Sequence, residues 1–217
     1  MMANETESTP KLPSREKLLL AAIKLVRERG FAATSVEDLC RAAGVTKGSF
    51  FHHFATKEEL GVAATHRWGA LASEMFAAIP WRDPVDPVDR VLAYLELRRS
   101  LLVGEIAEFT CFAGTLVQEA HATSDAIRRA CDEIITDGAR IIEADLVEAF
   151  RAYGSGDEDH ATSLALHVQA VIQGALVMAK AKGTADVAIE SVDHLRRYIE
   201  MLFSRNDTEI RAGVDQP

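Results

Sequence analysis

Apolar residues recur at helical spacing along most of this 217-residue chain, and this periodicity is the strongest constraint on its fold. One such stripe ends at Gly30, a residue type common at helix C-termini, and consists of Leu19, Ala22, Ile23 and Val26. Strand signals are scarce, because alternating β-branched runs are few and no Asn-Gly or Asp-Gly turn joins two apolar segments. The sequence therefore predicts an all-α protein.

Residues that start and stop helices divide the chain into about nine helices. The run Thr34-Ser35-Val36-Glu37 has the spacing of a capping box and begins a second helix, which ends at Gly44. Thr46 can cap a short third helix that reaches Phe54, and a fourth helix follows Thr56. Beyond the proline-rich connector WRDPVDP, the pattern predicts five more helices, at residues 88–102, 105–119, 125–153, 159–182 and 187–204.

Charge is distributed unevenly along the chain. The formal net charge is −9, yet residues 11–57 hold nine of the 24 basic and only four of the 33 acidic residues. This division indicates that the N-terminal segment faces an anion while an acidic body keeps the protein soluble. The longest charge-free run, residues 164–179, contains several polar residues and predicts a buried helix, so we expect no contact with a membrane.

Several classes of chemistry find no support in the sequence. The cysteines Cys40, Cys111 and Cys131 are widely spaced and form no CxxC motif, which favours a reducing cytoplasm over a disulfide framework or zinc ribbon. His52 and His53 point about 100° apart on a helix, so they cannot face one metal ion. No glycine-rich phosphate loop, GxSxG or HExxH motif is present, and we therefore expect neither an enzyme nor a cofactor.

The segment TKGSFFHHFATKEEL, residues 46–60, gives the third helix two different faces. Helical spacing places Phe50 and Phe54 on the side that packs against the first two helices. The opposite side carries small, basic and aromatic groups, namely Lys47, Gly48, Ser49, Phe51 and His52. Two helices joined by Ala-Gly-Val-Thr, the second of them short, predict a helix-turn-helix whose second helix enters the DNA major groove.

The run from Arg15 to Leu60, and above all GFAATSVEDLCRAAGVTKGSFFHHFATKEEL, resembles the DNA-binding domain of the tetracycline-repressor-like (TetR) family of bacterial regulators. The resemblance implies phosphate contacts from Thr34, Ser35 and Lys57, and recognition-helix contacts from Thr46, Lys47, Gly48, Phe51, His52 and His53. Family members often have tyrosine where this chain has Phe51, so one phosphate hydrogen bond gives way to apolar contact. Two alternatives stay open, a structural role for His53 and a core position for Phe51.

The resemblance also implies the organisation of the larger, acidic part of the chain. Family members are homodimers whose C-terminal domain binds a small molecule and thereby changes the spacing of the two DNA-binding heads. The predicted divisions are a disordered tail (1–13), a helix-turn-helix DNA-binding domain (14–60), an effector-binding and dimerisation domain (61–205) and a mobile tail (206–217). The expected function is a ligand-responsive regulator, most typically a repressor, on a near-palindromic operator.

Two helices of the second domain have the composition of a four-helix dimer interface. Small residues on the first helix are Ala161, Ala165, Ala170, Gly174 and Ala175, and apolar residues on the second are Val192, Leu195, Ile199 and Leu202. The alternative is that both helices close the core of a single subunit, since apolar spacing alone does not separate the two.

The effector pocket is predicted from a mixture of aromatic and polar side chains, each of which could equally be a core residue. They are Trp68, Leu71, Tyr94, Phe109, Cys111, Phe112, Thr115, Gln118 and His167. Cys111 lies between two aromatic residues and raises a second hypothesis, a redox- or electrophile-sensing regulator. An inert buried thiol is the alternative for this cysteine.

Overall fold

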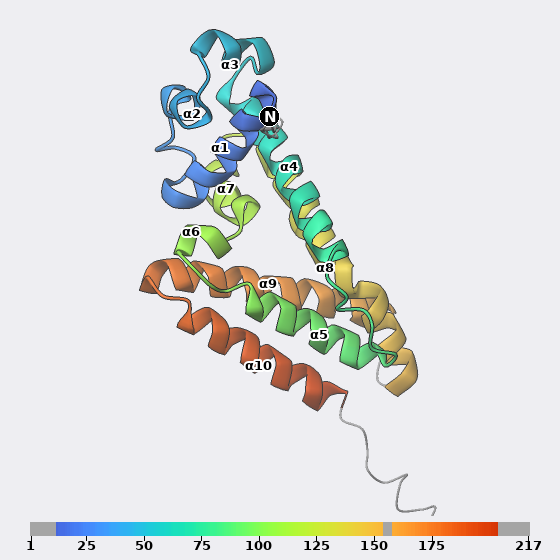
Figure 1. The fold of residues 1–217 in the computed structure, drawn as a ribbon. Helices are drawn as coiled ribbons and strands as arrows, with labels where there is room; N and C mark the ends of the chain where they lie inside the picture. The colour runs from blue at the N-terminus through green and yellow to red at the C-terminus, as the bar shows by residue number, and fades with distance from the viewer. Residues whose placement is uncertain (1–11, 154–157, 204–217) are drawn as a thin grey trace, which may run out of the picture.

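The computed structural model describes residues 12–153 and 158–203, and within these residues it consists of ten α-helices and no β-strand (Figure 1). This confirms the predicted all-α fold class. The tails predicted at 1–13 and 206–217 lie outside the described residues, apart from positions 12 and 13.

Four helices build the N-terminal end of the molecule: α1 (Ser14–Arg29), α2 (Val36–Ala43), α3 (Lys47–His53) and the first turns of α4 (Lys57–Ala77). Both threonines predicted at the starts of the third and fourth helices, Thr46 and Thr56, are observed as N-caps. Thr46 and Thr56 accept hydrogen bonds from the backbone of the third helical residue, at 3.1 and 3.0 Å. Gly44 ends α2 in the left-handed conformation, with φ of 63°. Local hydrogen bonding therefore determines where α3 begins and how it is oriented relative to α2.

The capping box of α2 lies one residue later than predicted. Ser35, not Thr34, is the N-cap, and it exchanges hydrogen bonds with Asp38 rather than Glu37. The reason is that the Thr34 hydroxyl donates to the Gly30 carbonyl at 2.7 Å, in a position where only 1% of Thr34 is exposed. Thr34 therefore closes the preceding turn and leaves the free N–H groups of α2 to Ser35.

Six helices form the rest of the protein: α5 (Pro87–Ser100), α6 (Ile106–Phe109), α7 (Phe112–Ala120), α8 (Asp125–Tyr153), α9 (Glu158–Lys182) and α10 (Asp186–Leu202). The single helix predicted at 105–119 is wrong, because Thr110 and Cys111 have extended backbone and separate α6 from α7. The Cys111 sulfur then caps α7 by accepting from the Gly114 N–H at 3.3 Å. This break raises the number of helices above the predicted nine.

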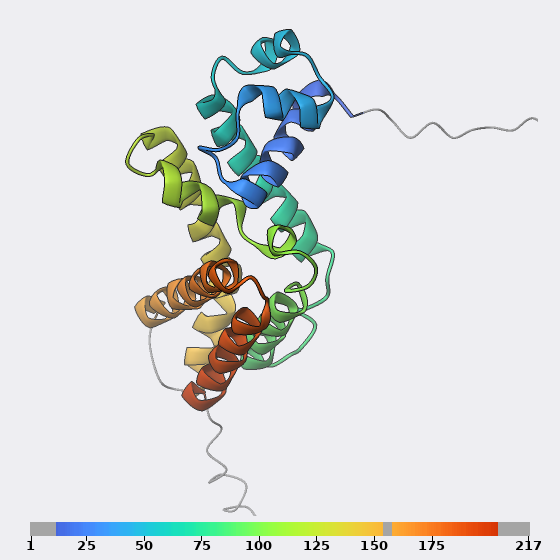
Figure 2. The ribbon, with the colours of Figure 1, turned by 90° about the vertical axis from the view of Figure 1, so that its left-hand side faces the viewer.

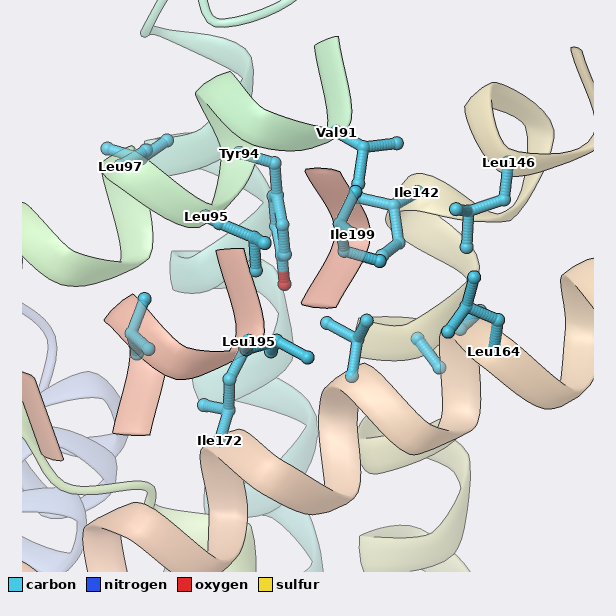
Figure 3. Close-up of a cluster of buried hydrophobic side chains, with 14 of the residues drawn as sticks. Val91, Tyr94, Leu95, Leu97, Ile142, Leu146, Leu164, Ile172, Leu195 and Ile199 are labelled. Atoms are coloured by element: carbon cyan, nitrogen blue, oxygen red, sulfur yellow. The ribbon is translucent and has the colours of Figure 1, made fainter. Parts of the chain in front are cut away.

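Two hydrophobic cores hold the molecule together. In the larger core, α5, α8, α9 and α10 direct aliphatic side chains around Tyr94, as Figure 3 shows. Each fully buried Leu or Ile there stabilises the fold by about 1.5–3 kcal/mol relative to an exposed position. The smaller core joins α1–α4 to α7 and the start of α8, through Phe112, Leu116 and Ile127. Figure 2 shows the N-terminal helices at one end and α9 and α10 toward the other.

The helix α4 runs without a break from the N-terminal helices into the rest of the molecule (Figure 1). The predicted division between residues 60 and 61 lies inside this helix, and it stays a prediction. By length and composition alone, Asp159–Lys182 could cross a membrane, and in this structure 44% of its most apolar window is buried. One face of the same helix supplies Ala161, Val168 and Ile172 to the larger core.

Candidate functional site

The exposed side of α3 differs in composition from the side that packs against the smaller core. Phe50 and Phe54 are 0% and 2% exposed and anchor the helix to the smaller core, as predicted. Phe51, between them, is 57% exposed, which excludes the core alternative for this residue. Gly48 and His52 are also exposed. Small, aromatic and basic groups thus lie together on the outer side of a short, capped helix.

The charge on this surface is held by an exposed ion pair. The Lys47 ammonium pairs with the carboxylate of Glu37 on α2, and this hydrogen bond lowers the pKa of Glu37. More than half of each side chain remains exposed, at 58% and 53%. Such pairs contribute little to stability, so Lys47 can exchange its partner for a phosphate at low energetic cost.

The residues outside α3 that were predicted to contact phosphate differ in exposure and in hydrogen bonding. Ser35 is exposed at the start of α2, whereas the Thr34 side chain is buried. The Lys57 ammonium donates to the carbonyls of Phe31 and Thr34, at 2.9 and 3.1 Å, and lies 4.3 Å from the centroid of the Phe31 ring. Burial lowers the pKa of Lys57. A phosphate contact by this ammonium would therefore have to replace bonds within the protein.

His53 lies at the border between the two sides of α3. It is partly exposed, and its ring meets those of His52 and Phe54 at centroid distances of 4.9 and 6.4 Å. Among the described residues, no group of three His, Cys, Asp or Glu side chains could hold a metal ion. Both roles proposed for His53 stay open.

A cavity of about 550 Å³ lies where α4, α6, α8 and α9 meet. Its wall is mainly apolar and contains four of the predicted pocket residues, namely Trp68, Leu71, Phe109 and Cys111. A concave, apolar space of this size with a few polar groups is typical of small-molecule sites.

The remaining predicted pocket residues do not line this cavity. Tyr94 and Phe112 are fully buried, one in each hydrophobic core. Thr115 accepts a hydrogen bond from Lys180 at 2.6 Å and lines a separate, charged cleft beside α1. Gln118 and His167 lie on exposed helix faces. Composition alone cannot predict which face of a helix meets a cavity, because that depends on how the helices pack.

The cavity wall also contains seven polar residues that the sequence did not predict: Arg27, Ser73, Arg98, Glu108, Asp137, Gln169 and Gln173. The Arg27 guanidinium lies 4.8 Å from the Trp68 ring centroid and donates to the Glu108 carbonyl at 3.0 Å. Burial lowers the pKa of Arg27. Arg27 belongs to α1, so a helix of the N-terminal unit forms part of the cavity wall. No sequence motif marks this residue.

Cys111 differs from the other two cysteines. It is partly exposed, it caps α7, and it lines the cavity. Cys40 and Cys131 are buried, and burial raises the pKa of both thiols, that of Cys131 to about 11. Cys111 also interacts electrostatically with Arg27 and Lys180.

The outer face of α9 carries no charged residue from Ser163 to Ala181. Its exposed positions are Ser163, Leu166, His167, Ala170, Gly174, Val177, Met178 and Ala181. Most other residues predicted for a dimer interface, including Ala161, Val192 and Ile199, are instead buried in the larger core. For these residues, the alternative of a subunit core is correct.

Comparison with known proteins links both ends of the chain to families of regulators. Residues 18–64 match the family described as bacterial regulatory proteins, tetR family. Residues 87–191 match the C-terminal domain of LmrA/YxaF-like transcriptional regulators.

Individual relatives agree with these matches. The chain is 31% identical over 147 residues to the transcriptional repressor NemR of Escherichia coli K12, across 68% of this chain and 70% of NemR. It is 27% identical over 174 residues to the regulator LmrA of Bacillus subtilis, across 76% of this chain and 85% of LmrA. The crystal structure of the reduced form of E. coli NemR superposes with a TM-score of 0.70 at 25% identity, covering 85% of this chain and 96% of NemR. The regulatory protein TetR from Rhodobacter sphaeroides has the same fold, with a TM-score of 0.74 at 21% identity. The match covers 85% of this chain and 97% of that protein.

Proposed function

This chain belongs to the TetR family of bacterial transcriptional regulators, and on that premise we propose that it is a homodimeric, cytoplasmic repressor that releases its DNA operator when a small molecule fills the cavity. The relatives are transcriptional regulators, which confirms the expectation that the chain is not an enzyme. Each subunit of the proposed dimer reads one half of a near-palindromic operator through α3.

The outer face of α3 is the observation that carries this proposal. Lys47 supplies an exposed positive charge, Gly48 permits close approach of the backbone, and Phe51 offers an apolar contact for a sugar or thymine methyl. Ser35 and Thr46 begin their helices at exposed positions, where N–H groups suit phosphate. The overall charge of the chain matters less than this local arrangement, since phosphate contacts act over short distances in salt.

The path from cavity to α3 also supports ligand control. Arg27 of α1 and Trp68 of α4 meet at the cavity wall, and both helices pack directly against the helix-turn-helix core. A ligand that displaces the Arg27 side chain or the neighbouring α6 would shift α1 relative to α4. In a dimer, such a shift changes the distance between the two recognition helices, and operator affinity falls.

A test of the α3 surface is electrophoretic retardation of DNA from the chain's own promoter region. Replacing Lys47 or His52 by alanine should weaken binding by about tenfold each. Lys47→Ala should also reduce the slope of log affinity against log salt by about one unit, because one ammonium no longer neutralises a phosphate. Lys182→Ala serves as the control, because it removes the same charge from the end of α9. Unchanged affinity in both α3 variants would refute the assigned surface.

A second candidate input is modification of Cys111, which the position of this thiol favours. Cys111 is the partly exposed cysteine of the three, and it lies at the start of α7 beside the charges of Arg27 and Lys180. A partly exposed thiol on the cavity wall can be reached by a small molecule, whereas the thiols of Cys40 and Cys131 are buried. On this hypothesis an electrophile that reaches the cavity bonds to the sulfur and acts as a covalent effector.

Iodoacetamide labelling of the folded protein tests the second candidate. Cys111 should react at least about tenfold faster than Cys40 or Cys131, because the buried thiols are shielded and have raised pKa values. The modified protein should then lose operator affinity, and Cys111→Ser should keep that affinity after treatment. Equal, slow labelling of all three cysteines would exclude the thiol as the input.

A further inference from the structure

One polar side chain in the cavity wall has no partner within the part of the chain that the structure describes. Gln169 is 6% exposed, and its amide oxygen Oε1 is buried without a hydrogen bond. The residue lines the cavity from α9. A buried amide without a partner is unfavourable, so a site that retains one normally satisfies it with a bound molecule.

The surrounding residues make room for this amide. Gly138 of α8 lies opposite Gln169, and a Cβ atom at Gly138 would come within 3.0 Å of the amide nitrogen. One helical turn along α9, Gln173 also lines the cavity, and its amide occupies space that a side chain at Gly114 would fill. Two amides therefore lie side by side on α9, each above a glycine.

The other polar groups of the wall restrict the charge of a ligand. Arg27 already donates to the carbonyls of Ile23 and Glu108, and Arg98 donates to the Tyr94 hydroxyl at 3.1 Å. The wall contains two guanidinium groups, Arg27 and Arg98, and two carboxylates, Glu108 and Asp137, so its formal charges cancel and favour a ligand without net charge. A carboxylate has no hydrogen to donate to the Gln169 oxygen. The unmet requirement is therefore a neutral hydrogen-bond donor.

We propose that Gln169 and Gln173 form a polar subsite for a neutral, largely apolar effector that donates an N–H or O–H hydrogen bond to the Gln169 oxygen. This inference rests on the proposed function, because it assigns the chemistry of the ligand to the same cavity. Gln169 acts as a specificity-determining residue: it favours a ligand that carries the donor over an isostere that lacks it.

Carbazole and dibenzofuran provide a matched pair of probes. They are tricycles of nearly the same shape, and carbazole has an N–H group where dibenzofuran has an ether oxygen. Equilibrium dialysis of the full-length protein should give a Kd about five- to tenfold lower for carbazole, the ratio expected for one hydrogen bond. In Gln169→Met, which replaces the amide by an apolar chain of similar length, the two Kd values should become equal.

Gln118→Met is the matched control, because Gln118 lies on an exposed face outside the cavity, and it should retain the preference for carbazole. If Gln169→Met folds poorly, Gln169→Leu is used in its place. Equal Kd values on the wild type, or a preference that survives in the Gln169 variants, would overturn the subsite and leave the cavity as a ligand site. If neither tricycle binds, the proposed subsite is wrong, whereas the DNA-binding part of the proposed function is tested separately by the α3 variants.

Discussion

A single carboxylate joins the turn between α1 and α2 to a distant part of the chain. Glu119, near the end of α7, accepts a hydrogen bond from the Ala32 N–H at 2.8 Å, across 87 positions of sequence. Gly30 makes this approach possible, because a Cβ atom there would collide with the Glu119 carboxylate. The backbone of Gly30, with φ of 90° and ψ of 162°, is also one that residues with a side chain avoid.

Gly30→Ala should therefore destabilise the protein by about 2–3 kcal/mol, from backbone strain and from displacement of Glu119. Gly44→Ala is the matched control: Gly44 also has positive φ, but no atom lies within 4 Å of a Cβ placed there. Its cost should be about 1 kcal/mol, from the left-handed backbone alone. Urea denaturation measures both free energies of unfolding, and equal losses would show that the contact with Glu119 carries no weight.

The direction of a side chain on a helix could be predicted from the sequence, but its partner could not. Helical angle alone separated buried Phe50 and Phe54 from exposed Phe51. The same spacing rule did not distinguish Thr34 from Ser35 as the cap of α2, because either hydroxyl fits the pattern. The choice depends on the Gly30 carbonyl, four residues earlier, which the turn between α1 and α2 places beside the Thr34 hydroxyl.

The start of α2 shows how a capping box fixes the position of an element and makes it sensitive to pH. Asp38 accepts hydrogen bonds from the backbone and hydroxyl of Ser35, at 3.1 and 2.7 Å. These bonds, with the nearby Arg29 and Arg41, lower the pKa of Asp38 from 3.8 to about 2. The folded state thus prefers the ionised carboxylate, and this stabilisation is present above about pH 4 and disappears as the pH falls toward 2.

In Ser35→Ala, the pKa of Asp38 should rise toward its ordinary value, because the hydroxyl of Ser35 is the largest cause of its depression. NMR titration of the Asp38 carboxyl carbon measures this directly. The variant should also be less sensitive to acid between pH 4 and 2, and less stable by about 1 kcal/mol at neutral pH through loss of the cap. Thr46→Ala, which removes the cap of α3 instead, should leave the pKa of Asp38 unchanged.

The break between α6 and α7 marks the limit of prediction at the scale of elements. Thr46 and Thr56 signalled helix starts and Gly30 and Gly44 signalled helix ends, but Thr110-Cys111 lies within the helical pattern predicted at 105–119 and contains neither glycine nor proline. Glu105 and Glu108 form a capping box that marks where α6 begins, but it does not show where that helix ends. Thr110, at 0% exposure, turns inward where the two helices separate. The break therefore depends on the burial of Thr110, which the spacing of apolar residues does not predict.

At the scale of the whole molecule, the sequence predicted a helical cavity but only part of its wall. Trp68 and Phe109 were predicted because aromatic residues are common in pockets. Arg27 was assigned to the DNA-binding end, and the contact of its guanidinium with Trp68 exists only because α1 and α4 pack together. Gln169 and Gln173 read as interruptions of an apolar helix, and their role depends on the glycines opposite them.

The uncharged outer face of α9 leads to a prediction about assembly. Ala170 lies in the middle of this face, with Leu166, Val177 and Met178 exposed nearby at 47%, 42% and 46%. In a twofold-symmetric dimer through this face, Ala170→Arg inserts two charged side chains, one from each subunit, into an interface whose exposed positions carry no charge. The dimer Kd should rise by at least about a hundredfold, with a loss of operator affinity.

Ala144→Arg is the matched control, since Ala144 is equally an exposed alanine in the interior of a helix, on α8. Sedimentation equilibrium should find a dimer for this control and a monomer for Ala170→Arg at micromolar concentration. Circular dichroism should show the same helix content in both, because Ala170 contributes nothing to the core of a subunit. A dimer of undiminished affinity in Ala170→Arg would place the interface elsewhere, and the two recognition helices would then need a different face to hold them at the spacing of an operator.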